Sequence, residues 1–123
     1  MKTWTAAIED IGNLPEKVVR GTLIGMGTKI IKRSPVDTGR FRGNWQFTIG
    51  RPAQGQIASG GVPTSELVSA SNSWQSGQTF YITNNLPYGE RLEYGWSKQA
   101  PQGMVRLTLG EYRQVLKTEA DKL

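Results

Sequence analysis

Residues 15–35 read PEKVVRGTLIGMGTKIIKRSP, and this stretch decides the fold. Pro15 suits the first turn of a helix, because an N–H at that position would have no partner. Pro35 ends the helix, because the residue before a proline is pushed out of the helical region. Four apolar residues between them recur at i, i+4, i+7 and i+11, the spacing of one helical face: Val19, Leu23, Met26 and Ile30. The stretch therefore predicts one long amphipathic helix.

Two glycines interrupt this helix. Gly21 and Gly25 lie four residues apart, and each costs about 1 kcal/mol relative to alanine. Close approach of another backbone would offset that cost. Packing against the chain's own sheet is the more ordinary explanation, and packing at a subunit interface is the alternative.

Alternating apolar residues downstream predict two β-strands. Residues 44–49 place Trp45, Phe47 and Ile49 on one face, and residues 79–83 repeat the pattern. These two strands are suited to antiparallel pairing.

Shorter elements are predicted around this centre. We expect a short helix over residues 3–12, a turn over residues 36–43, and a turn leading into a short helix over residues 86–94 that Gly95 closes. A C-terminal helix of about four turns is predicted by apolar residues at the same helical spacing: Val105, Leu109, Tyr112 and Leu116.

The segment between the two strands, residues 50–78, is rich in Gly, Ser, Pro and Gln. Loops of that length are uncommon in a compact domain unless they are functional or disordered. We therefore expect a long extended arm that is flexible or that orders on a partner, with a brief helical turn at residues 65–68.

The whole chain, residues 1–123, suits one domain. The order of the predicted elements indicates an α+β fold. A small antiparallel sheet would be packed by the long helix of the N-terminal half and by the C-terminal helix.

Composition argues against catalysis. The chain has no histidine and no cysteine, which removes the usual general base, the Ser-His-Asp arrangement and thiolate metal sites. The few carboxylates are scattered, and no glycine-rich phosphate loop is present. We expect no enzyme activity, no cofactor and no metal site.

Targeting signals are also missing from the sequence. The N-terminus lacks the apolar core of a signal peptide. No stretch approaches ~18 uninterrupted apolar residues. We expect a soluble protein, made in a cytoplasm, that does not interact with membranes.

The formal net charge is +5, which suits an anionic partner such as nucleic acid. Positive side chains concentrate from the end of the long helix to the start of the first predicted strand, and five of them are candidates to face DNA or an acidic partner: Lys29, Lys32, Arg33, Arg40 and Arg42. The alternative for the first three is that they are the polar end of a helix, where the macrodipole favours cations. No recognition-helix pattern accompanies the charge, so we do not expect sequence-specific DNA reading.

The hydrophobic fraction of 37% is low for a free-standing domain, so a partner could complete the core. Large aromatic residues often anchor interfaces. Trp4, Trp74 and Trp96 fall in a terminal helix or in loops and are therefore candidate interface residues, together with the two glycines. Packing under a loop of the same chain is the equal alternative for each.

Two stretches carry a resemblance to a known family. Residues 34–42 read SPVDTGRFR, directly after the long helix, and residues 81–95 read YITNNLPYGERLEYG. In order and spacing they resemble the neck, or tail-completion, proteins of long-tailed bacteriophages, which are related to the lambdoid minor tail protein Z and to head–tail joining proteins. That family has a P-x-D-T-G-x-L-R turn, a Y-x-x-x-x-E-x-G segment and a P-x-x-M start to its last helix. The matching positions are Pro35, Asp37, Thr38, Gly39, Tyr88, Glu93, Gly95, Pro101 and Met104.

The match covers about half of the chain and has departures. Phe41 stands where the family commonly has leucine, Gly103 intervenes before Met104, and the arm has no fixed counterpart. The resemblance implies a structural virion protein, made in the bacterial host cytoplasm, that forms a ring, expected to be a hexamer, at the neck. Its implied partners are further copies of itself, the head connector or stopper protein, the tail terminator or tail tube protein, and genome DNA passing through the lumen without sequence recognition.

Other functions stay open on sequence grounds. A tail terminator has a similar size and α+β character. A small basic DNA-binding module is the alternative from another class, and steep salt dependence of DNA affinity would favour it. A regulatory protein that binds a host factor is a further possibility.

Overall fold

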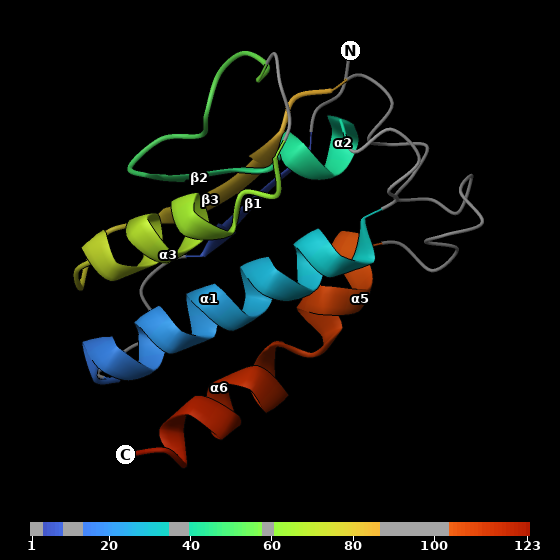
Figure 1. Ribbon diagram of the computed structural model, residues 1–123. Coiled ribbons are helices and arrows are strands. Elements are labelled where there is room, and N and C mark those ends of the chain that lie inside the picture. The colour runs from blue at the N-terminus through green and yellow to red at the C-terminus, as the bar shows by residue number, and fades with distance from the viewer. Residues whose placement is uncertain (1–3, 9–13, 35–39, 58–60, 87–103) are drawn as a thin grey trace.

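The computed structural model describes residues 4–8, 14–34, 40–57, 61–86 and 104–123 (Figure 1). The chain has an α+β fold in which a long helix, α1, lies between two layers. A three-stranded sheet and helix α3 lie on one side of α1, and helices α5 and α6 pack against its other side. Along the chain the order is β1 (Trp4–Ile8), α1 (Glu16–Arg33), α2 (Arg40–Gly43), β2 (Gln46–Ile49), α3 (Thr64–Ser73), β3 (Phe80–Asn84), α5 (Met104–Gly110) and α6 (Tyr112–Ala120).

The sheet has the order β1-β3-β2, and both pairings are antiparallel. In one, Gln46 of β2 lies opposite Thr83 of β3. In the other, Trp4 of β1 lies opposite Asn84. The predicted antiparallel pairing of the two later strands is therefore confirmed, and β3 is the central strand.

Helix α1 supplies the centre of the core. The prediction of one long helix that ends before Pro35 is confirmed, because α1 spans Glu16–Arg33. The four residues of its predicted apolar stripe are all buried: Val19, Leu23, Met26 and Ile30. Most of them share one hydrophobic cluster with Phe47 of β2 and with Phe80 and Ile82 of β3, so burial of this face joins the helix to the sheet.

The N-terminal segment does not form the expected helix. Residues Trp4–Ile8 are strand β1, which pairs with β3 along its whole length. The segment contains Trp4, Thr5 and Ile8, which are residue types that fit a pleated strand. The segment becomes a strand because it pairs with β3, which lies more than 70 residues later in the chain. The pattern of neighbouring residues in the sequence cannot indicate such a distant pairing.

The expected arm at residues 50–78 is also wrong. Thr64–Ser73 form helix α3, which packs on α1 and β2. Leu67 and Trp74 are fully buried. The end of the segment is tied to α1, since the Arg20 Nε donates to the Trp74 carbonyl at 2.8 Å. The helical turn predicted at residues 65–68 lies within α3, and the helix is longer than the Ser- and Gly-rich composition indicated.

The C-terminal helix is broken in two, at Glu111, rather than continuous. Gly110 weakens the helix just before the break. Within α5 the buried residues are Val105 and Thr108, three positions apart, whereas Leu109, predicted on the buried stripe, is 47% exposed. In α6 the buried residue is Val115, one position before the predicted Leu116. The prediction extended one helical period from Val105 to Leu116, but the helix is interrupted at Glu111 between them.

The close approach expected at the two glycines is present, and the neighbour is α6 rather than the sheet. A Cβ at Gly21 would lie 2.5 Å from Glu119 Oε2, and one at Gly25 would lie 2.8 Å from Val115 Cγ1. Gly27 faces α3, where a Cβ would lie 2.5 Å from Leu67 Cδ1. Three glycines thus let two different helices approach α1 closely.

Substitution of Gly27 by alanine should destabilise the protein, although alanine is the better helix former. Leu67 is fully buried and cannot move aside, so overpacking of about 1–3 kcal/mol should outweigh the gain of about 1 kcal/mol in helix propensity. Urea unfolding followed by tryptophan fluorescence would measure the loss.

The matched control is Gly21→Ala on the same helix. Its new Cβ meets only the end of the flexible, partly exposed Glu119 side chain, so this variant should keep or increase the free energy of unfolding. Equal stabilisation by both substitutions would contradict the close packing of α3 on α1.

Candidate functional site

Two of the five candidate cations are ion-paired within the chain. The Lys29 Nζ lies 3.1 Å from Glu111 Oε2, and the Arg33 guanidinium contacts both carboxylate oxygens of Glu111. Arg33 Nη1 also donates to Thr108 Oγ1 at 3.0 Å. Helix α1 is therefore bonded to the α5–α6 break through these side chains. Their hydrogen bonds, that of Arg33 first, lower the pKa of Glu111 from its ordinary value.

A third cation, Arg42, binds the C-terminal end of α1. Its Nη2 donates to the carbonyls of Lys32, at 3.0 Å, and of Ser34, at 2.7 Å. These carbonyls lack partners inside the helix and carry the negative end of its dipole. Arg42 thus serves α1 as a side-chain cap supplied from α2.

The remaining two candidates are exposed. Lys32 lies at the C-terminal end of α1, and Arg40 begins α2, where its Nη2 donates to Gln56 Oε1 at 3.1 Å. Of the five cations, four therefore bond to oxygen atoms of the chain itself: Lys29, Arg33, Arg40 and Arg42. That they face DNA or an acidic partner stays a prediction.

The two ends of the family-like turn are joined by buried hydrogen bonds. The Trp45 Nε1 donates to Ser34 Oγ at 2.7 Å, and Ser34 Oγ donates to the Ile30 carbonyl. Asn84 Nδ2 donates to the Phe41 carbonyl at 2.9 Å. These bonds fix the end of α1 against the start of β2. Most of the motif positions lie outside the described residues: Pro35, Asp37, Thr38, Gly39, Tyr88, Glu93, Gly95 and Pro101. Met104 begins α5.

The tryptophans have different positions. Trp45 and Trp74 are each 1% exposed, so Trp74, a candidate interface residue, is packed inside its own chain. Its Nε1 donates to the Gln78 carbonyl at 2.9 Å. Trp4 lies in β1, and Trp96 lies outside the described residues.

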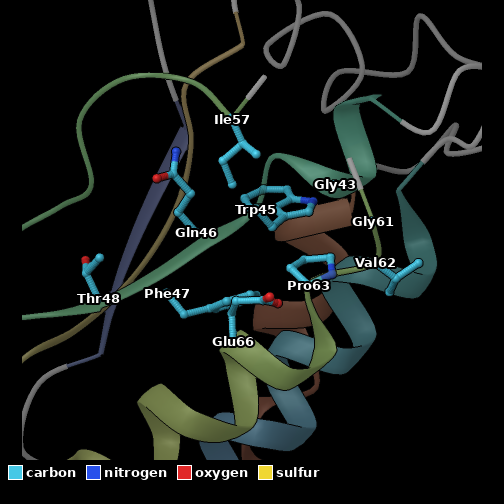
Figure 2. A pocket seen from close by; sticks show the side chains of 10 residues that line it. All are labelled: Gly43, Trp45, Gln46, Phe47, Thr48, Ile57, Gly61, Val62, Pro63 and Glu66. Atoms are coloured by element: carbon cyan, nitrogen blue, oxygen red, sulfur yellow. The ribbon is translucent and has the colours of Figure 1, made fainter. Parts of the chain in front are cut away.

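Sequence reasoning missed a groove of about 310 Å³ along the edge of β2 (Figure 2). Trp45 and Phe47 of the strand region line it. Ile57 lies on one wall, and Pro63 and Glu66, at the start of α3, lie on the other. The two walls come from the segment that was expected to be an arm, so no sequence signal pointed to a groove there.

Polar side chains hold the loop that forms the upper wall. Asn44 exchanges two hydrogen bonds with the Ile57 main chain, at 2.8 Å to its N–H and 3.3 Å to its carbonyl. Gln46 Nε2 and Asn85 Nδ2 both donate to the Gly55 carbonyl, at 3.0 and 2.8 Å. The described part of the loop is therefore fixed over β2 and β3 by side chains.

Among the described residues, no group of three or more histidine, cysteine, aspartate or glutamate side chains could hold a metal ion. In the same part of the chain, no helix is long and apolar enough to cross a membrane. Comparison with known proteins found no matching protein-family model, no matching curated protein and no matching solved structure.

The Glu111 cluster should make stability depend on pH. The pKa of Glu111 is lower in the folded state than in the unfolded chain, where it is near the ordinary value of about 4.3. Its contribution is therefore fully present above that pH and is lost as the pH falls through the lowered folded value. We expect wild type to exceed Glu111→Gln in free energy of unfolding at pH 7 and the difference to shrink below pH of about 4.

Urea unfolding of both proteins between pH 7 and pH 3 would measure this. A difference that stays constant over the whole range would show that the charge of Glu111 does not contribute to stability.

Proposed function

We propose that this chain is a structural protein of a bacteriophage neck, which joins the DNA-filled head to the tail. The observation that carries the proposal is the order of the family-like segments around α1: the SPVDTGRFR turn after the helix, the YITNNLPYGERLEYG segment, and the P-x-x-M start of the last helix. The first segment links α1 to β2, the second begins with β3, and Met104 begins α5.

The contacts at this turn support a structural role for the motif. Arg42, within the motif, caps α1, and Ser34, at its start, accepts the bond from Trp45. Both interactions fix where the helix ends and where the strand begins. A motif that holds two elements together has no need of a reactive group.

The proposed role is non-catalytic. The chain lacks histidine and cysteine. Glu111, a carboxylate whose pKa is lowered, is bound by Arg33 and Lys29. That pairing leaves it ill suited to proton transfer at neutral pH.

The proposed assembly is a ring, of six subunits by analogy with the family, located in the virion and made in the bacterial host cytoplasm. A closed ring needs head-to-tail interfaces, so each subunit presents two different surfaces. The stopper or connector above, the tail terminator or tube below, and DNA in the lumen are its proposed partners. The pairing of Lys29, Arg33 and Arg42 within the chain gives the DNA-binding module less support than the neck protein.

The test is a nonsense codon at Lys17, an exposed residue near the start of α1, in this gene, with electron microscopy of lysates from a host without a suppressor tRNA. We expect DNA-filled heads beside separate, unattached tails, because the junction cannot form. The same phage grown in a suppressor host is the control and should give joined, infectious particles. Joined particles in the non-suppressing host would overturn the neck assignment.

A further inference from the structure

Among the residues that the structure describes, strand β2 pairs along one edge, with β3, and no strand pairs with the other edge. Its register with β3, together with the hydrogen bond from Gly50 N–H to the Thr79 carbonyl at 2.9 Å, sets which of its main-chain groups face β3. In an antiparallel pair these groups alternate, so Gln46 and Thr48 bond to β3 while those of Phe47 and Ile49 point away. No described residue bonds to these outward groups.

The sequence of this strand does not block its edge. Proteins commonly protect an open edge with a charge, a proline or a bulge. Strand β2 reads QFTI and contains neither a charge nor a proline, and its pairing with β3 is regular over Gln46–Ile49. Ile57 and the start of α3 lie beside this edge without bonding to its outward main-chain groups, so these groups are able to accept another strand.

The groove lies along this edge and provides apolar walls. Phe47, Ile57 and Pro63 line it, and Val62, at its rim, is 58% exposed (Figure 2). The outward N–H and C=O groups of β2 occur at every second residue. An extended polypeptide has N–H and C=O groups at the same spacing, whereas a small molecule does not. The apolar walls suit an apolar side chain on that polypeptide.

One charge lies in the groove. Glu66, on the first turn of α3, is exposed and makes none of the ion pairs found among the described residues. The chain as a whole carries a formal charge of +5, so an acid beside an apolar groove is a local exception. Charge complementarity therefore favours a lysine or arginine on the occupant.

We propose that the β2 groove binds an extended segment of a partner protein, which pairs with β2 as an added strand and carries an apolar side chain next to a basic one. The main chain of that segment bonds to Phe47 and Ile49, its apolar side chain lies between Ile57 and Pro63, and its cation faces Glu66. This inference does not depend on the neck assignment, because it follows from the edge, the walls and the charge alone.

The test uses the folded full-length chain and a random library of displayed heptapeptides. We expect selection to enrich peptides that alternate apolar residues with lysine or arginine. On binding of the synthetic enriched peptides, amide hydrogen exchange at Phe47 and Ile49 should slow at least tenfold. Peptides with N-methyl groups at the pairing positions should bind at least tenfold more weakly, because they cannot donate to β2.

Variants of the exposed groove residues separate the two kinds of contact. Glu66→Lys should weaken the basic peptides at least tenfold, and Val62→Asp should weaken all of the enriched peptides. Asp121→Lys is the matched control, since it makes the same charge change on an exposed residue just after α6, a helix that packs on α1 and α5. It should leave binding unchanged.

Three results would overturn the proposal. The first is a library that yields no enriched peptide. The second is a failure of the enriched peptides in either measurement, so that their binding does not slow amide hydrogen exchange at Phe47 and Ile49 or is not weakened by Glu66→Lys. The third is slowed exchange at these amides when the chain alone is concentrated, which would identify a second copy as the occupant.

Discussion

The fold depends on the burial of α1 on more than one side. Buried residues on this helix face the sheet, α3 and the C-terminal helices, and they include Val18, Thr22 and Ile31 as well as the predicted stripe. A helix enclosed in this way cannot carry large side chains at every contact. Gly21 and Gly25 admit α6, and Gly27 admits Leu67 of α3. Their cost in helix propensity, about 1 kcal/mol each, is offset by the packing they permit.

The centre of the molecule was predictable from sequence, and its periphery was not. The stripe on α1 and the alternation in β2 and β3 are strong periodic signals that agree with the final packing. Strand β1 was missed because its structure comes from pairing with β3. Helix α3 was predicted only as a brief turn because its sequence, TSELVSASNS, has only a few apolar residues, of which Leu67 is fully buried. In both cases a contact distant in sequence outweighed a weak local preference.

The candidate sites show the same division. Clustering of positive charge at the end of α1 was evident from sequence, but its principal partner, Glu111, lies 78 residues beyond Arg33. No spacing rule connects such a pair. The groove was hidden for a related reason, since its walls require the folded positions of Ile57 and Pro63 around β2. The positive charge at the end of α1 is therefore partly neutralised by Glu111, which the sequence does not indicate. The groove beside β2 is likewise visible only in the structure.

The break at Glu111 divides the C-terminal region into parts that are held unequally. Helix α5 is bonded to Arg33 through Thr108 and buries Val105. Within Tyr112–Ala120, by contrast, Val115 is the one buried residue. Helix α6 nevertheless lies closely along α1, because Gly21 and Gly25 leave room for Glu119 and Val115. The two parts of the C-terminal region are thus attached to α1 by different means. Helix α5 is attached through specific buried side chains, and α6 is attached through the close fit of two helix surfaces where α1 has no side chain.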